Sequence, residues 1–113
     1  MALNINGTTG ISGVDGSASA PAVTGTDSNT GINFASDTVN INTGGSTRVT
    51  VDSNGRLGIG TSSPSDKLTI SSGNLAFIGG TNDAQYIKFG DSGDDDIGNI
   101  FYYHGNNNMV FTT

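Results

Sequence analysis

The segment VDSNGRLGIGTSSP, residues 51–64, decides the fold of this chain, because a turn signal separates two stretches of alternating residues. Residues 53–55 predict a three-residue hairpin loop in which Gly55 takes the left-handed conformation. The pairs predicted from the turn outward are Asp52 with Arg56, Val51 with Leu57, Thr50 with Gly58, and Val49 with Ile59. This register places the four large apolar side chains on one face, whereas a two-residue loop would divide them between both faces.

Gly58 and Gly60 share the opposite face of this hairpin with Thr50. Glycine inside a strand lowers stability and often marks a bulge or the close approach of another backbone. Two interpretations stay open: simple tolerance of glycine in a loop-like strand, or the packing of a second chain against a flat face.

The composition of the 113 residues favours strands and turns over helices. Gly, Asn, Ser and Thr together exceed half of the chain, and all ten acidic residues are Asp. Hydrophobic residues amount to 33%, so a single chain would bury only a thin core. The chain has no cysteine for disulfides, which leaves oligomerisation as the expected source of further stability.

The charge balance argues against several classes of partner. The net charge is −6 with only four Lys and Arg residues, so we expect neither a nucleic-acid partner nor an anionic membrane partner. No apolar run approaches the ~18 residues of a transmembrane helix, and the first residues lack the pattern of a secretory signal peptide.

The chain is expected to have three parts: residues 1–31, 32–70 and 71–113. The first part holds five large apolar residues, namely Leu3, Ile5, Ile11, Val14 and Val23, and composition alone describes it as disordered or as an extended arm that orders on a partner. The other two parts alternate like short strands and hairpins, without helical periodicity, so the fold class is all-β. Residues 63–66 are expected to form one helical turn, and residues 74–78 alternate like a further strand.

Few residues suggest chemistry. The pattern Gly-Ile-Gly-Thr at 58–61 lacks the further glycine, lysine and helix of a phosphate loop. The acidic residues Asp91, Asp94, Asp95 and Asp96 carry oxygen ligands that suit calcium, but their spacing is not that of an EF-hand and a solvated turn is favoured.

The lone His104 is expected on the surface. The aromatic residues Tyr86, Phe101, Tyr102 and Tyr103 are assigned to hairpin packing, with contact to sugar as the alternative. No catalytic, cofactor-binding or metal-binding residue is predicted, and no enzymatic activity is expected.

The run DTVNINTGGSTRVTVDSNGRLGIGTSSPSDKLTI, residues 37–70, resembles the repeat of tail fibres and related virion proteins of tailed bacteriophages. Its hallmark here extends from Arg48 to Leu68 and includes the fairly specific Gly-Ile-Gly-Thr-Ser-Ser-Pro. Residues 87–113 resemble segments that alternate with that repeat, and residues 5–31 resemble the N-termini of structural proteins of cyanobacterial and marine phages.

The resemblance implies a non-enzymatic virion protein, the N-terminal anchoring part of a homotrimeric, interdigitated tail fibre that leads to a distal receptor-binding region. Residues 1–31 would dock on a tail adaptor, nozzle or baseplate by strand addition, with Leu3, Ile5, Ile11 and Val14 as anchors. Gly58 and Gly60 would pack between the chains of the trimer.

Three other functions stay open. The first alternative is a capsid decoration or head-fibre protein bound to the major capsid protein; the others are a carbohydrate-binding adhesin module and a tailspike depolymerase. Residues 98–113 weakly repeat the pattern of residues 31–51, which predicts a truncated second module and a native chain that continues beyond Thr113.

Overall fold

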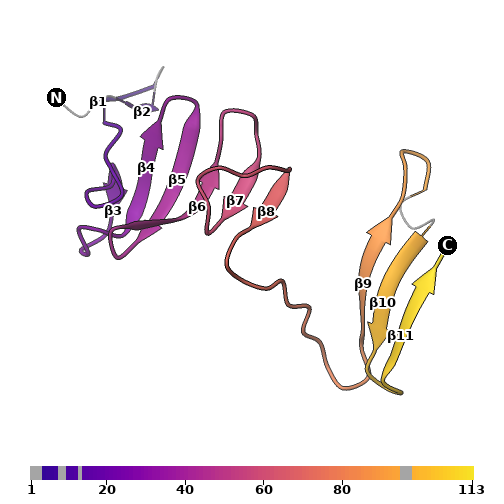
Figure 1. The fold of residues 1–113 in the computed structure, drawn as a ribbon. Coiled ribbons are helices and arrows are strands. Elements are labelled where there is room, and N and C mark those ends of the chain that lie inside the picture. Colours follow the sequence, from indigo (N-terminus) through magenta and orange to yellow (C-terminus); the bar gives the residue numbers. More distant parts are fainter. Residues whose placement is uncertain (1–3, 8–9, 13, 95–97) are drawn as a thin grey trace. The chain divides into compact units, whose positions relative to one another are not determined.

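The computed structural model describes residues 4–7, 10–12, 14–94 and 98–113, and Figure 1 shows its ribbon. The chain divides into two compact units, Met1–Asn74 and Leu75–Thr113. All regular secondary structure in the described part of the chain is β-strand, so the predicted all-β class is confirmed.

The first unit is built on a six-stranded sheet with the order β3-β4-β5-β6-β7-β8. Its strands are β3 (Val23–Thr24), β4 (Gly31–Ala35), β5 (Thr38–Thr43), β6 (Ser46–Val51), β7 (Leu57–Ile59) and β8 (Leu68–Ile70). Neighbouring strands are antiparallel except β7 and β8, which are parallel. A separate hairpin joins β1 (Asn4–Asn6) and β2 (Gly10–Ser12).

The β6–β7 hairpin has the register that the sequence predicts. Val51 pairs with Leu57, Thr50 with Gly58, and Val49 with Ile59. Gly55 closes the loop with φ 67°, and its N–H donates to the Asp52 carbonyl at 2.9 Å. The three-residue loop therefore collects the apolar residues of this hairpin on one face.

The segment between β7 and β8 is irregular, so the helical turn expected at residues 63–66 is wrong. Side chains satisfy the backbone donors that a helix would have used. The Thr69 hydroxyl accepts hydrogen bonds from the N–H groups of Ser65 (3.1 Å) and Asp66 (3.2 Å), and the Thr61 hydroxyl accepts one from Ser63 (3.1 Å). This compact segment lets β8 run parallel to β7 after a short connection.

The expected extended arm differs from the structure in two places. Ile5 pairs with Ile11 in the β1–β2 hairpin, where antiparallel pairing satisfies backbone groups that an isolated arm would leave open. Residues 23–24 form β3 at the edge of the large sheet, and the Phe34 N–H donates to the Asp15 carbonyl at 2.8 Å. The second half of this region therefore belongs to the folded unit.

The second unit is a three-stranded antiparallel sheet with the order β11-β10-β9 (Figure 1). Its strands are β9 (Ala84–Phe89), β10 (Gly98–Tyr103) and β11 (Asn108–Thr112). The hairpin expected around residues 104–108 is confirmed by the pairing of Tyr103 with Asn108. Residues 74–78 are not a strand, because alternation alone supplies no neighbouring strand to pair with.

Candidate functional site

The most prominent surface of the first unit is an apolar face of the six-stranded sheet. The register aligns its side chains in two rows across the strands. One row contains Val23, Ile32, Ile41, Val49, Ile59 and Ile70, and the other contains Phe34, Val39, Val51, Leu57 and Leu68. Seven of these residues are between 38% and 51% exposed, and none of the eleven is buried. We call this set the apolar sheet face.

The opposite face of the same sheet is polar, and it is the buried one. Asn42 and Thr50 are each 1% exposed, and Asn33 is 7% exposed. The Asn42 amide donates to Asn33 Oδ1 at 2.8 Å, the Thr47 hydroxyl donates to Asn42 Oδ1 at 2.9 Å, and the Thr50 hydroxyl donates to Asn40 Oδ1 at 2.9 Å. These bonds compensate the desolvation of the amides and hydroxyls.

The segment after β7 covers part of this polar face. A Cβ added at Gly58 would collide with the Thr61 carbonyl oxygen, and Pro64 in the same segment is less than 2% exposed. The close backbone approach predicted at Gly58 is therefore present, but the approaching backbone belongs to the same chain.

Gly60 is required for a second local reason. Its φ is +75°, and an added Cβ would lie 2.6 Å from the Ser71 carbonyl oxygen. Left-handed backbone and close contact both favour glycine here. Since contacts within the chain account for Gly58 and Gly60, these glycines no longer argue for a trimer, and their role between chains stays a prediction.

The four proposed anchors of the N-terminal region have different outcomes. Leu3 lies outside the described residues, as do the side chains of Ile5 and Ile11, although the backbones of these two isoleucines form a cross-strand pair. Val14 is 38% exposed. Their role in docking stays a prediction.

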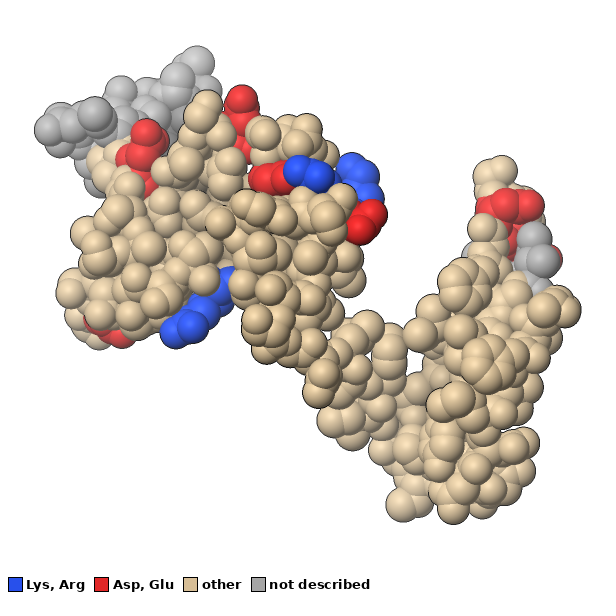
Figure 2. Space-filling model, in the orientation of Figure 1, with Lys and Arg blue, Asp and Glu red and all other residues tan. Residues whose placement is uncertain are grey.

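The charged side chains of the described residues lie apart on the face that Figure 2 shows. They occupy small separate groups there, and most of that visible surface is uncharged. Arg56 forms a salt bridge with Asp52 (2.8 Å) at the predicted closing pair of the hairpin. The Arg56 backbone N–H donates to the Asp52 carboxylate at 2.9 Å. This bond, together with the hydrogen bonds from the Arg56 side chain and from the Asn54 N–H, lowers the pKa of Asp52 below its usual 3.8.

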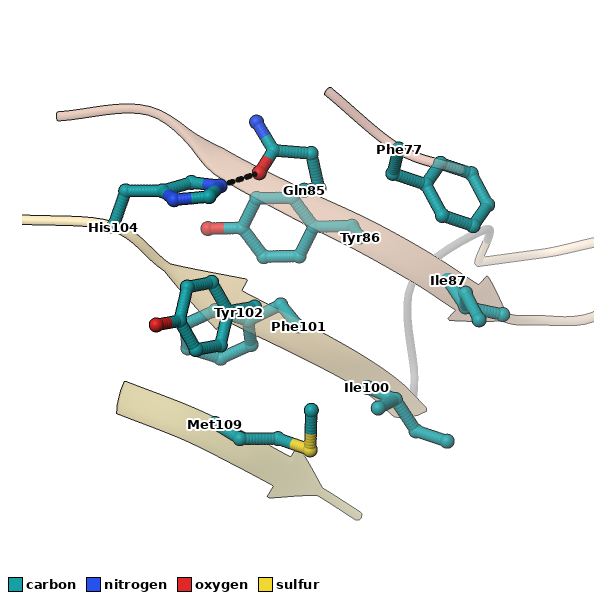
Figure 3. A pocket seen from close by; sticks show the side chains of 9 residues that line it. All are labelled: Phe77, Gln85, Tyr86, Ile87, Ile100, Phe101, Tyr102, His104 and Met109. Atoms are coloured by element: carbon teal, nitrogen blue, oxygen red, sulfur yellow. Dashed lines mark hydrogen bonds between the residues drawn. The ribbon is translucent and has the colours of Figure 1, made fainter. Parts of the chain in front are cut away.

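The second unit carries a hollow of about 260 Å³ on its three-stranded sheet (Figure 3). Its lining residues are Phe77, Gln85, Tyr86, Ile87, Ile100, Phe101, Tyr102, His104 and Met109. His104 Nε2 lies 2.5 Å from Gln85 Oε1, and the Tyr102 and His104 rings meet edge to face at 4.8 Å. The lone histidine thus belongs to this sheet surface, where the Gln85 amide oxygen is the partner of its Nε2.

The acidic turn between β9 and β10 is described only in part, since Asp95 and Asp96 lie outside the described residues. Asp91 Oδ1 accepts hydrogen bonds from the N–H groups of Gly93 (2.8 Å) and Asp94 (3.2 Å). Across the residues that the structure describes, no group of three or more His, Cys, Asp or Glu side chains could hold a metal ion. The same residues include no helix long and apolar enough to cross a membrane.

Comparison with family models, with curated protein sequences and with solved structures finds no match to this chain. The candidate site therefore rests on the geometry of the chain itself. Sequence reasoning found the alternation of each strand but did not assemble the apolar sheet face. The sequence did contain a signal for this face, because β4 to β7 all repeat the same alternation of apolar and polar residues and each strand pairs antiparallel with the next.

Proposed function

We propose that this chain is a non-enzymatic structural protein of a phage virion, the N-terminal anchoring part of a trimeric tail fibre that leads to a distal receptor-binding region. The motif from Arg48 to Leu68, which resembles a repeat of such fibres, supports the assignment to this class. The apolar sheet face supports the assembly of several chains.

The apolar sheet face is the observation that carries the proposal. A sheet with one apolar face is stable when that face packs on another layer. No large apolar side chain is buried anywhere in the described part of the chain, while Asn42 and Thr50 are buried on the other side of the sheet. A monomer with this arrangement would expose a contiguous apolar patch that is unusual for soluble single chains.

Copies of the same chain are the partner that fits this face. The two rows contain no charged residue, so identical faces meet without like-charge repulsion. Asp37, Asp52 and Arg56 lie in the turns at the ends of the strands, where they stay in water after assembly. The apolar sheet face would then be the common core of the fibre.

The N-terminal hairpin is assigned to docking on the virion. A two-stranded hairpin has two free edges, and an edge can pair with a strand of another protein through main-chain hydrogen bonds. β1 and β2 form their own sheet and are not strands of the six-stranded one, so their edges are not used by it. The partner would be a tail adaptor, nozzle or baseplate protein.

The first test is the mass in solution, measured by sedimentation velocity over a range of concentrations. A species three times the 11.4 kDa of the chain is expected, and a monomer at all concentrations would contradict the proposal. Deletion of residues 2–13 should leave this trimer intact, because β3 and the rest of the sheet remain.

The second test is location on the particle. Immunogold electron microscopy of the encoding phage, with an antibody against residues 32–113, should label the tail and lose the label after deletion of residues 2–13. Label over the head would favour a capsid decoration protein, and particles without label, with an accessible epitope, would contradict a virion role.

A further inference from the structure

The proposed function makes no use of the hollow on the three-stranded sheet of the second unit. Its volume is about 260 Å³, and the residues that line it include no charged side chain. Phe77 reaches it from the segment before β9, and the other lining residues belong to the strands or, for His104, to the turn after β10. All of them lie in the second unit, so the hollow is complete within that unit.

Two polar side chains form one end of the hollow (Figure 3). His104 Nε2 lies 2.5 Å from Gln85 Oε1, and since an amide oxygen only accepts hydrogen bonds, Nε2 carries the proton. Nδ1 of the neutral ring is then an acceptor, and it makes no hydrogen bond to any residue that the structure describes. This end therefore offers a hydrogen-bond acceptor to a ligand in a lining that is otherwise mostly apolar.

Neighbouring groups hold this polar pair in place. The Tyr102 and His104 rings meet edge to face with their centroids 4.8 Å apart, and the His104 backbone N–H donates to the Asp83 carbonyl at 3.1 Å. A Cβ added at Gly79 would collide with Gln85 Nε2, so the backbone there packs directly on the amide. Polar groups that are fixed before binding lose less entropy when a ligand arrives.

The size and the surroundings of the hollow suit a single side chain. Pockets for drug-sized ligands span about 300–1,000 Å³, whereas an apolar cavity of about 150 Å³ already accepts benzene. At about 260 Å³ the hollow holds one aromatic ring. Phe77 and Met109 in its lining remain 49% and 60% exposed, so a backbone that carries such a ring would cover further apolar surface.

The charge and the hydrogen-bonding capacity of the hollow define which ring fits. An ionised group would lose its hydration among uncharged residues, and the net charge of −6 on the chain disfavours anions further. Phenylalanine would fill the apolar part but leave His104 Nδ1 covered without a partner, which costs free energy. Tyrosine and tryptophan combine a neutral ring with one donor, so they match both parts of the lining.

We propose that this hollow is a docking site for the ring of a tyrosine or tryptophan that another protein presents on its surface. The ring lies among the apolar lining residues, and its O–H or N–H donates to His104 Nδ1. This inference goes beyond the proposed function, because the second unit carries the whole site whatever the number of chains in the assembly.

An NMR titration of the full chain with capped amino acids tests the proposal. The probes are N-acetyl-tyrosine amide and N-acetyl-phenylalanine amide, which differ by one hydroxyl. The tyrosine probe should shift the amide signals of the lining residues saturably, with a dissociation constant of about 1 mM. The phenylalanine probe should bind about 2- to 12-fold more weakly, which is the effect of one hydrogen bond. Equal affinities, or shifts on the apolar sheet face instead of the hollow, would overturn the inference.

Two tryptophan substitutions on β9 control for the location of the site. Ile87 lines the hollow, so Ile87→Trp should fill it and weaken the tyrosine probe about tenfold or more. Phe89 lies on the same strand outside this hollow, so Phe89→Trp should keep the affinity within about twofold. If Ile87→Trp lowers the strand signal in circular dichroism, Met109→Trp replaces it. Equal affinities of the filled variant and the Phe89→Trp control would place binding elsewhere and contradict the site.

The role of His104 and the source of the ring have separate tests. His104→Phe keeps a ring beside Tyr102 without the acceptor, so the two probes should then bind alike, and a surviving preference for tyrosine would contradict the assigned hydrogen bond. Tighter binding of free p-cresol than of the tyrosine probe would show that a peptide backbone is not accommodated, and docking of a protein side chain would be wrong. A monomeric mass in sedimentation would contradict the proposed fibre and leave these titrations unaffected.

Discussion

Replacement of Ile41 by Thr tests whether the apolar sheet face is an interface between chains. Ile41 lies on β5 near the middle of its row, paired with Ile32 on one side and Val49 on the other. Threonine keeps the β-branched shape that suits a strand, so the local strand is expected to persist. The change therefore removes apolar surface from the face with little effect on the backbone.

The size of the effect follows from the exposure of Ile41, which is 46% in the single chain. Full burial of an isoleucine contributes about 1.5–3 kcal/mol, so covering the exposed part contributes about 0.7–1.4 kcal/mol per chain. Three copies lose about 2–4 kcal/mol together, which lowers the trimer association constant about 30- to 1,000-fold. Sedimentation velocity over a dilution series measures this constant.

Ile78→Thr is the matched control, because Ile78 is 90% exposed and lies outside every strand. It should leave the association constant within about threefold of the original, a change of roughly 0.7 kcal/mol. An equally small change for Ile41→Thr would refute the assignment of the apolar sheet face as an interface.

The remaining predictions concern the fold of the first unit, each measured by thermal or urea unfolding. Gly58→Ala should destabilise the unit by about 1–3 kcal/mol, because the added Cβ collides with the Thr61 carbonyl oxygen. Gly25→Ala is the control and should leave the stability unchanged, because open space surrounds Gly25. Equal losses of stability in the two variants would contradict the close approach at Gly58. Asn42→Ala should lose about 1–3 kcal/mol for each partner left unsatisfied, namely Asn33 Oδ1 and the Thr47 hydroxyl, and an unchanged midpoint would show that these bonds are unimportant. Because the folded chain lowers the pKa of Asp52, the Asp52 carboxylate stabilises the fold at pH values above its usual pKa of 3.8, and this stabilisation is lost as the pH falls through the lowered pKa. Asp52→Asn should therefore be less stable than the original chain at pH 7, and the difference in stability should shrink under strong acid.

The strands themselves could be predicted, since alternation and turn chemistry act over a few residues. The register of β6 and β7 followed from the choice of a three-residue loop, and Gly55 takes the expected left-handed conformation. The same reasoning failed at residues 74–78, where alternation is present but no neighbouring strand pairs with it. A strand depends on its partner, and the partner is a non-local property of the chain.

The side of the sheet that is buried could not be predicted, because the usual rule assigns burial to the apolar face. Here the segment that contains Thr61 packs on the polar face, where Gly58 leaves room for its backbone. The glycine pattern did indicate a close approach, but a single sequence does not distinguish a neighbouring chain from the same chain. The position of β3 was missed for a similar reason, since Val23 is the only large apolar residue between Val14 and Ile32 and forms a strand only beside Ile32.

Both sheets offer an apolar surface to a partner, and the mass in solution tests how many copies meet. The apolar sheet face is one surface per chain, with Asn42 and Thr50 sealed on the other side, so either two or three copies around an axis would cover it. In the second unit, Tyr86, Phe101 and Met109 line one hollow. The trimer therefore stays a prediction: a species of two chains would keep the apolar sheet face as an interface but contradict the fibre, because an isologous pair covers that face without a third copy.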